Sequence, residues 1–245
     1  PIGMIIEIML SRFYYKWLKF LIIDKILVKR TINFIVKFRP YMIHLEKFKN
    51  IILPLFFYFT IGFNIIFAKE LQIGAQMPEI NHKLNGINGE KITLGQIKGS
   101  KGTLVIFSCN TCPWVIKWED RYVDLASSYL KKGIGMIAVN SNISRFKGDD
   151  SLNKMKKHAK ENNYNFPYAQ DPKAKLAYAF GATKTPHVYL FDNKEKLVYR
   201  GAIDDNARDA DNVEEPFLSN AIDQLLAGKK IKKTTSKAIG CSIKF

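Results

Sequence analysis

Short apolar runs alternate with helical patterns in the second half of the chain. The run TLVIF, Thr103–Phe107, is rich in β-branched residues, and IGMIAVN, Ile134–Asn140, is similar. Runs of this kind are typical of strands that are buried on both faces. The segment between them has large apolar side chains at the spacings of one helix face: Trp114, Trp118, Tyr122, Leu125 and Tyr129. A strand, a helix and a strand at this spacing predict a right-handed crossover between parallel strands.

The following segments continue the α/β pattern. One helix is predicted around 151–162 and another near 172–180, with FPYAQD between them as a short edge strand. HVYLF and KLVYRGAI flank a turn at 192–194 and predict an antiparallel hairpin. A last helix has its apolar side chains on one face from Leu218 to Leu226 and stops at Gly228. Parallel strands followed by an antiparallel hairpin predict a mixed sheet.

The N-terminal part of the chain has a different pattern. Ile51–Ala68 is an uncharged apolar run of 18 residues, preceded by Lys47 and Lys49 and followed by the polar KELQ. This pattern indicates a signal peptide, and the run is close to the about 20 residues that a membrane anchor needs. The domain that follows is therefore expected to be exported to the periplasm or another extracytoplasmic space. If residues 51–68 are not cleaved, they are expected to tether it to the membrane.

This pattern divides the chain into four expected segments. They are an upstream or non-core extension at 1–41, a signal peptide or membrane anchor at 42–68, a folded domain at 69–228 and a basic C-terminal tail at 229–245.

Composition changes this picture little. The chain has 38 Lys and Arg against 22 Asp and Glu, a formal net charge of +16. Ten of the basic and three of the acidic residues lie in residues 1–50, and the other basic residues are scattered over predicted helix faces. Since no basic groove with interleaved aromatic side chains is evident, the charge indicates a solvated lysine-rich surface rather than nucleic-acid binding. The chain has three cysteines, Cys109, Cys112 and Cys241. These are too few for a disulfide-stapled fold or a four-cysteine zinc site.

Two of these cysteines, Cys109 and Cys112, stand in FSCNTCPW, between a predicted strand and a predicted helix. Such a pair can be a redox couple, half of a metal site or two buried thiols. At this point of the chain the sulfurs would lie in the loop and the first helical turn, where unpaired N–H groups stabilise a thiolate and lower the thiol pKa. A thiolate attacks disulfides, and a second cysteine resolves the mixed disulfide. The position therefore favours redox chemistry.

Four stretches, in this order, carry a resemblance to a known family: GAQMPEINHKLNGINGEKITLGQIKGSKGTLVIF, CNTCPW, YAFGATKTPHVYLFD and YRGAIDDN. Residues from about Gly74 to Gly228 resemble the thioredoxin-like superfamily, in particular its redoxin branch of peroxiredoxin-like proteins with a thioredoxin-type cysteine pair. The ending GCSIKF is similar to the tail of that group. The resemblance implies a thioredoxin-like α/β fold, a central mixed sheet flanked by helices.

The resemblance also implies a site and an activity. In this fold a cis-proline faces the redox pair; that is Pro186 here, and Thr185 before it has backbone groups free to pair with a thiol partner. Cys109 and Cys112 would form a dithiol/disulfide couple that reduces or exchanges disulfides in exported proteins, with no bound cofactor. Trp114, beside the pair, is expected to help shape the docking surface. The partners are thiol or disulfide proteins that serve as substrate and electron donor.

Two mechanisms of this superfamily compete. In the thioredoxin type Cys109 attacks, whereas in the peroxiredoxin type the cysteine before a helix-initial proline, Cys112, attacks peroxide. Peroxiredoxins carry Thr or Ser three residues before that cysteine and an arginine on the strand that begins here with TPHV. In this chain Cys109 occupies the position of that Thr or Ser, and the strand that begins with TPHV has no arginine. Arg200, on the next strand, is a poor substitute. Disulfide exchange is the expected activity, and thiol peroxidase activity is the alternative.

Other residues have open assignments. His187 could join the pair in a third function, a Cu(I)-binding chaperone, because thiolates and imidazole suit Cu(I); no resident metal is expected. Cys241 is either an extra resolving thiol or a tail thiol without a role. The strand before the pair lacks the buried acid of thioredoxins, and Glu119 and Asp120 nearby are expected to be solvated. The acidic loop DDNARDADN, Asp204–Asn212, lacks the ligand spacing of a calcium site and is also expected to be solvated.

Overall fold

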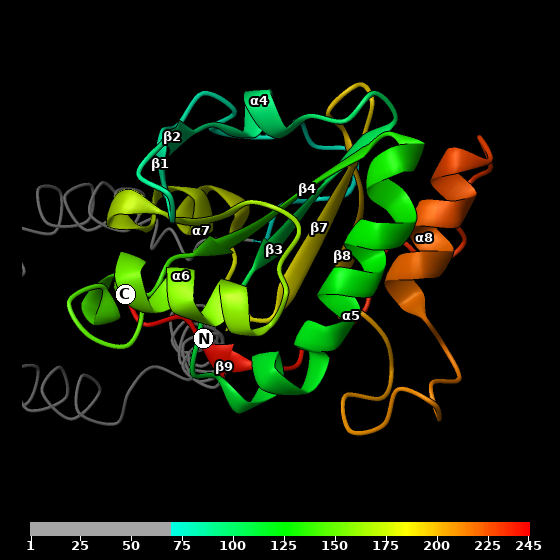
Figure 1. Cartoon of the computed structure of the whole chain (residues 1–245). Coiled ribbons are helices and arrows are strands. Elements are labelled where there is room, and N and C mark those ends of the chain that lie inside the picture. The colour runs from blue at the N-terminus through cyan, green and yellow to red at the C-terminus, as the bar shows by residue number, and fades with distance from the viewer. Residues whose placement is uncertain (1–69) are drawn as a thin grey trace, which may run out of the picture. The chain divides into compact units, whose positions relative to one another are not determined.

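Hydrophobic side chains on both faces explain why two of the predicted strands form the middle of a sheet. The computed structural model describes residues 70–245. Every residue of β3 (Gly102–Phe107) is buried, as is every residue of β4 (Ile134–Asn140) except Gly135. β3 pairs in parallel with β4 and antiparallel with β7 (His187–Asp192), which confirms the mixed sheet (Figure 1).

In the described part of the chain the main sheet has seven strands, in the order β2-β1-β5-β4-β3-β7-β8. The remaining strands are β1 (Leu84–Gly86), β2 (Lys91–Ile92), β5 (Tyr168–Gln170) and β8 (Leu197–Gly201). β7 and β8 form the predicted antiparallel hairpin. The prediction of an edge strand for FPYAQD is wrong, because β1, from a distant part of the sequence, pairs with the outer side of β5.

Helices cover both faces of this sheet. One face carries the larger apolar cluster and three helices: α5 (Pro113–Tyr129), α6 (Leu152–Glu161) and α8 (Phe217–Leu226). The other face carries the second apolar cluster and two helices: α4 (Leu94–Ile97) and α7 (Lys175–Phe180). Short 3-10 turns complete the connections: η2 (Leu130–Lys132), η3 (Ile143–Arg145) and η4 (Pro172–Ala174). The sheet is thus flanked by helices as expected.

The helix after the cysteine pair, α5, has distinct start and end signals. Cys112 is its N-cap residue, with extended backbone, and Pro113 occupies its first position, where a missing N–H costs no hydrogen bond. The turn η2 continues the helix, and Gly133 ends it in the left-handed conformation with a φ of 91°. Trp118 and Tyr122 point from α5 into the core and fix the helix on the sheet.

The C-terminal segment lies against the domain. Thr234 and Ser236 exchange backbone hydrogen bonds with Arg200 of β8. Farther on, β9 (Cys241–Ser242) pairs antiparallel with β6 (Lys184–Thr185), forming a two-stranded sheet of its own (Figure 1). The basic segment 229–245 therefore returns to the end of the molecule at which α5 begins.

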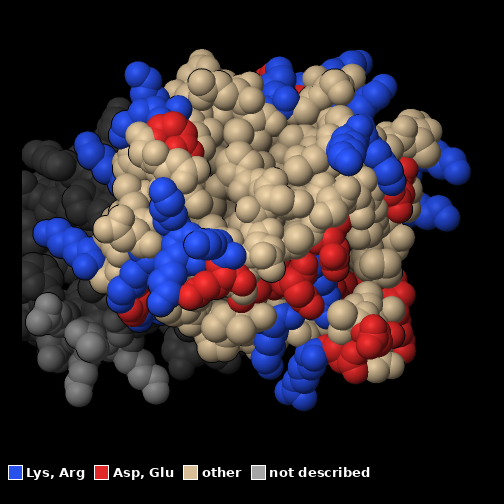
Figure 2. All heavy atoms as spheres, viewed as in Figure 1, with Lys and Arg blue, Asp and Glu red and all other residues tan. Residues whose placement is uncertain are grey.

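Three of the expected features lie outside the described residues: the extension at 1–41, the signal peptide or anchor at 42–68 and its tether at 51–68. No helix within residues 70–245 is both long and apolar enough to cross a membrane. On the face shown in Figure 2, Lys and Arg side chains are scattered, whereas Asp and Glu gather in a band toward the lower right. That corner is where Figure 1 shows the loop after β8, which exposes Asp205, Asp209 and Glu214.

Candidate active site

The loop between β3 and α5 places both cysteines of the pair inside the molecule. Cys109 and Cys112 are each 3% exposed, and both are free thiols. Their side chains belong to the apolar cluster under α5, together with Trp118 and Tyr122. Cys112, as the N-cap, stands at the end of α5 where the helix dipole is positive. The pair is therefore shielded from water and lies where a negative charge is favoured.

Cys112 is the sulfur that this environment stabilises as a thiolate. The thiols of Cys109 and Cys241 and the backbone N–H groups of Val115 and Cys241 lie near its sulfur as donor groups. These donors lower the pKa of Cys112 to about 4, with the Cys109 hydrogen bond as the largest cause, although burial acts in the opposite direction. Cys112, at the first turn of α5, is therefore the thiol of the pair that loses its proton more readily.

Cys109 has the opposite tendency. Its pKa is raised, first because its thiol donates to Cys112 and then by burial, and the negative charge of Asp150 adds to this. Its Sγ lies 3.4 Å from Thr185 Oγ1, a contact that opposes the rise. Within the pair, Cys112 is the sulfur that more readily becomes a thiolate, and Cys109 is the one that keeps its proton. Disulfide exchange needs this division, because one sulfur attacks and the other resolves.

Thr185 and Pro186 lie beside the pair. The peptide bond between them is cis. The Sγ of Cys112 lies 3.1 Å from the Thr185 carbonyl oxygen, to which it donates when protonated. The structure thus brings Thr185 together with both sulfurs. The sequence predicts a free backbone at Thr185, but it is paired with Cys241 of the chain's own tail.

Cys241 completes a cluster of three cysteines. It is half-buried and lies opposite Thr185 in the β6–β9 ladder, next to Cys112. Its pKa is raised, first by burial and then because its thiol donates to Cys112, whereas a hydrogen bond from the Trp114 N–H acts against this rise. Trp114 itself is half-buried in the second position of α5 and packs against the cluster under that helix.

A buried polar network holds the loop between the two cysteines of the pair. The Asn110 N–H donates to Asp150 Oδ1 at 3.0 Å, and Asn142 Nδ2 donates to Asp150 Oδ2 at 3.0 Å. The Tyr168 hydroxyl donates to Asn110 Oδ1 at 3.0 Å and accepts from Asn140 Nδ2 at 3.2 Å. Asp150 is fully buried. This network fixes the loop and supplies the negative charge near Cys109.

Sequence reasoning missed this network, although a signal was present. Asn140, Ser141 and Asn142 form a polar run where the buried strand β4 ends. In open α/β sheets, functional side chains gather outside the carboxyl ends of parallel strands. β3, which leads to Cys109, ends at the same edge because β3 and β4 are parallel.

Glu119 is not solvated, so that prediction is wrong; Asp120 is exposed. Glu119 is 7% exposed, its Oε2 lies 2.7 Å from His158 Nε2, and it accepts a hydrogen bond from the Tyr164 hydroxyl at 3.2 Å. These partners come from α6 and the segment after it, so the local helical pattern could not reveal them. Glu119 links α5 to α6.

His187 lies on the other face of the sheet from the sulfurs. Its ring packs on Tyr189, with 4.5 Å between ring centroids, and Tyr189 belongs to the cluster of α4 and α7. Burial lowers the pKa of His187 to about 4, so its ring is neutral. Within residues 70–245 no group of three or more His, Cys, Asp or Glu side chains is arranged to hold a metal ion. The hypothesis that His187 joins the pair as a Cu(I) ligand is therefore wrong.

Arg200 does not take the place of the missing peroxiredoxin arginine, because it pairs with Glu70. Arg121 and Arg145 also pair with carboxylates. Among the described residues, none of the hydrogen bonds and ion pairs of arginine side chains goes to a cysteine.

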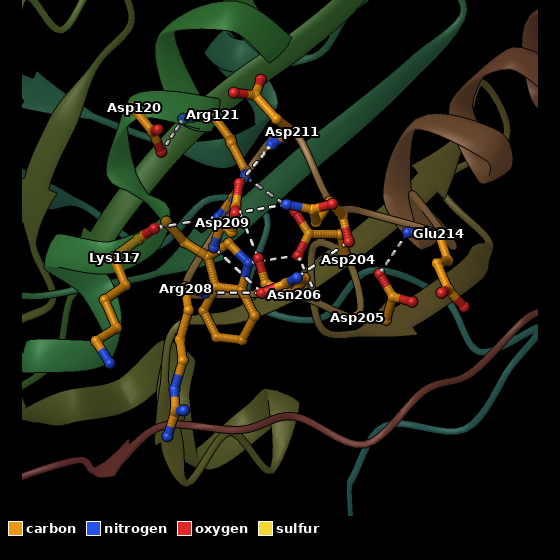
Figure 3. Close-up of polar contacts among 12 residues, drawn as sticks. Lys117, Asp120, Arg121, Asp204, Asp205, Asn206, Arg208, Asp209, Asp211 and Glu214 are labelled. Carbon is orange, nitrogen blue, oxygen red and sulfur yellow. Dashed lines mark hydrogen bonds and ion pairs between the residues drawn. The ribbon is translucent and has the colours of Figure 1, made fainter.

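The acidic loop after β8 is anchored to α5 at its first residue (Figure 3). Asp204 is 4% exposed; it accepts a hydrogen bond from Trp118 Nε1 at 2.7 Å and pairs with Arg121 Nε at 3.1 Å. Arg121 also donates to the Asn206 carbonyl at 2.9 Å. The prediction of a solvated loop is thus wrong for Asp204, although Asp209 and its neighbours are exposed. Trp118, held in this way, packs beside Trp114 with 6.1 Å between ring centroids.

Comparisons with known proteins agree with this fold. An uncharacterized conserved protein from Geobacillus kaustophilus is 36% identical, with a TM-score of 0.66, over 71% of this chain and 92% of that one. A hypothetical protein from Sinorhizobium meliloti 1021 is 31% identical, with a TM-score of 0.66, over 72% of this chain and 96% of that one. No match was found among curated proteins.

A thioredoxin-like protein solved in its oxidized form is 23% identical, with a TM-score of 0.53, over 65% of this chain and 99% of that one. At this identity the match shows the fold alone, which is thioredoxin-like. The family model Redoxin matches residues 72–215, more than half of the chain, and that span includes Cys109, Cys112, Thr185 and Pro186. Thiol redox activity in general follows from this match, and the chain belongs to the redoxin family.

Proposed function

We propose that this protein is a thiol–disulfide oxidoreductase that reduces or exchanges disulfides in other proteins, with Cys112 as the nucleophile and Cys109 as the resolving thiol. One observation carries the proposal: Cys112 is the N-cap residue of α5, where the positive end of the helix dipole and neighbouring donor groups lower the pKa of its thiol to about 4. Thiolates stabilised at a helix N-terminus are reactive in disulfide exchange.

The cycle follows from this geometry. The Cys112 thiolate attacks a substrate disulfide, one substrate sulfur leaves as a thiolate, and a mixed disulfide with Cys112 forms. Cys109, which precedes Cys112 in the same loop, then attacks the Cys112 sulfur. The Cys109–Cys112 disulfide forms, the second substrate sulfur leaves, and the two substrate thiolates end with two protons, one of them from Cys109. The reverse sequence oxidises a partner dithiol.

Docking is assigned to Thr185, Pro186 and Trp114. The Thr185 carbonyl lies 3.1 Å from the Cys112 sulfur, so a partner strand that displaced β9 from this edge would bring its own sulfur to the same place. Trp114 offers a half-exposed aromatic surface one residue from the helix start. The cycle needs no bound cofactor, since electrons pass between thiol proteins.

The test is the reduction of insulin by dithiothreitol, followed as turbidity. We expect catalysis by the wild-type chain, only the uncatalysed rate with Cys112→Ser, and a rate below that of wild type with Cys109→Ser. Ser128→Ala, on the exposed side of α5, is the matched control and should behave as wild type. Wild-type activity in the Cys112→Ser variant would refute Cys112 as the nucleophile, and an inactive wild type would refute the function.

A second candidate, a thiol peroxidase, is favoured by the same thiolate, because Cys112 stands directly before Pro113 at the helix start. The Cys112 thiolate would attack the O–O bond and become a sulfenic acid as water or an alcohol leaves. A second thiol would then condense with the sulfenic acid and release water. Peroxide consumption that survives Cys109→Ser but not Cys112→Ser, together with no insulin reduction, would select this candidate.

The proposed place of action is outside the cytoplasm. Support comes from the apolar run Ile51–Ala68 with the basic residues before it. Expression of the full chain fused to a periplasm-dependent reporter such as alkaline phosphatase should give active reporter. Reporter activity that does not change when residues 51–68 are deleted would overturn this assignment.

A further inference from the structure

The C-terminal strand β9 occupies the edge at which the proposed site would receive a substrate. Cys241 lies opposite Thr185 and Ser242 lies opposite Lys184 in an antiparallel ladder. Extended peptides bind to exposed strand edges in the same manner, through backbone hydrogen bonds. Cys241 therefore stands where the cysteine of a bound substrate strand is expected, in a segment of the chain itself.

The contacts of Cys241 converge on Cys112. The Cys112 sulfur lies 3.1 Å from the carbonyl oxygen of Thr185, the residue that Cys241 faces in the ladder, and the nearby Cys241 thiol and N–H lower the pKa of Cys112. The backbone N–H of Trp114 lowers the pKa of Cys241, and the backbone N–H of Val115 lowers the pKa of Cys112. Both sulfurs thus lie beside the first turn of α5, although burial leaves the pKa of Cys241 raised. Each of the two can act as an attacking or a leaving group.

The chain on both sides of Cys241 holds this arrangement in register. Before it, Gly240 packs so closely on Thr185 that an added Cβ would collide with the Thr185 carbonyl group. Three contacts follow it: Ile243 N–H to the Thr183 carbonyl at 3.0 Å, Lys244 N–H to Asn142 Oδ1 at 2.8 Å, and the Phe245 ring on Tyr178 with 4.6 Å between centroids. The approach of Cys241 to Cys112 is therefore a built feature of the fold.

We propose that Cys241 is a third redox thiol of this site, which forms a disulfide with Cys112 and passes it between the buried pair and an external protein. The proposal rests on the proposed function, because it starts from the Cys109–Cys112 disulfide. Exposure gives the reason for a third thiol: Cys109 and Cys112 are each 3% exposed, whereas Cys241 is only half-buried.

The exchange step conserves electrons and protons among the three cysteines of the chain. The Cys241 thiolate attacks the Cys112 sulfur of the oxidised pair, the Cys109–Cys112 bond breaks, and the Cys112–Cys241 bond forms. Cys109 leaves as a thiolate and takes up the proton that Cys241 gave up, so the oxidation state of the protein does not change. A partner dithiol then attacks the Cys241 sulfur, and Cys112 leaves as a thiolate. The second partner thiol releases Cys241, and the partner has lost two electrons to the protein.

The test maps disulfides in the full chain after mild oxidation with oxidised glutathione, by alkylation, digestion without reductant and mass spectrometry. In wild type we expect both the Cys109–Cys112 and the Cys112–Cys241 disulfide. In Cys109→Ser, Cys112–Cys241 should be the sole intramolecular disulfide. In Cys112→Ser, Cys109 and Cys241 should both remain free, because neither has another sulfur beside it.

A pair of tail variants tests the geometry without removing a thiol. Gly240→Ala should force β9 away from Thr185 and reduce the Cys112–Cys241 disulfide in the Cys109→Ser background. Ser242→Ala, whose side chain is exposed, is the matched control and should leave that disulfide at its original level. Equal yields in these two variants would refute the role of β9 in presenting Cys241.

Failure of this inference differs from failure of the proposed function. If Cys112 and Cys241 stay unlinked in Cys109→Ser while wild type reduces insulin and forms Cys109–Cys112, the third thiol is refuted and the function stands. If wild type does not reduce insulin, the function fails, and the Cys109→Ser variant still decides whether Cys241 pairs with Cys112.

Discussion

Cys112 has a thiol neighbour on each side, and different kinds of structure hold the two. Cys109 precedes it in the same loop, which buried side chains fix through Asn110 and Asp150. Cys241 comes from the far end of the chain, in a two-residue strand held by backbone pairing at a sheet edge. Because a short edge strand can open without disturbing the core, the two neighbours suit different tasks. A fixed thiol can resolve the same sulfur in every cycle, and a detachable one can exchange with partners.

The largest expected effect comes from removing both neighbours at once. With Ellman's reagent, Cys112 should form a mixed disulfide with thionitrobenzoate, which Cys109 or Cys241 then resolves. The double variant Cys109→Ser, Cys241→Ser should therefore retain the adduct, as mass spectrometry would show, whereas each single variant should lose it. An adduct that persists in Cys109→Ser alone would show that Cys241 does not resolve.

The pH dependence of alkylation should separate Cys112 from Cys241. Hydrogen bonds lower the pKa of Cys112 to about 4, so its reaction with iodoacetamide should be nearly constant between about pH 6 and 8 and fall toward pH 4. Since the folded-state pKa lies below the unfolded-state value, the stability contributed by this thiolate is complete above about pH 9 and declines as pH falls. Cys241, whose pKa is raised, should react faster with rising pH. Parallel profiles for the two thiols would contradict this assignment.

The midpoint potential of the Cys109–Cys112 couple tests how strongly the thiolate is stabilised. A stabilised thiolate favours the reduced form and makes the disulfide more oxidising. We expect a potential above the about −270 mV of thioredoxin, measured by equilibration with glutathione buffers. A value at or below that figure would mean that the site acts as a reductant.

The loop that holds Cys109 beside Cys112 depends on Asp150. Asp150→Ala leaves the buried Asn110 N–H without its acceptor and should lower the free energy of unfolding by about 1.5–3 kcal/mol, as measured by urea denaturation. Asp149→Ala, the matched control, removes an exposed carboxylate next in sequence and should change stability little. Equal effects would show that the network does not hold the loop.

The smallest effect is expected in hydrogen exchange of the native protein. The amides of Ile243 and Lys244, which bond to Thr183 and Asn142, should exchange faster than those of Val105 and Ile137 in the central strands. Equal protection would mean that β9 opens only with the whole domain, and Cys241 would then have no separate mobility.

The fold could largely be predicted, because its central elements have strong local patterns. The strand at 103–107, the aromatic helix after it and the hairpin at β7 and β8 all follow from periodicity and turn residues. The interior position of β5 could not, because a three-residue strand carries no sign of the distant strand that covers it.

The site also has residues that the sequence could predict and residues that it could not. Cys109 and Cys112 could be predicted from their spacing and position, and the family resemblance adds Pro186. The partners of Glu119 and the position of Cys241 depend on pairings between distant segments, which leave no local pattern. Asn140 and Asn142 could have been found from the polar run at the end of β4, whereas the contact of Asp150 with Asn110 could not.

The side-by-side indoles of Trp114 and Trp118 give this protein an intrinsic optical probe. Both rings sit at the helix start that carries the sulfurs, and Trp118 is locked by Asp204. Thiolates and disulfides quench nearby tryptophan emission to different extents, so fluorescence should report the oxidation state of the cysteines in real time. Stopped-flow mixing could then time each exchange without a dye or a modified substrate.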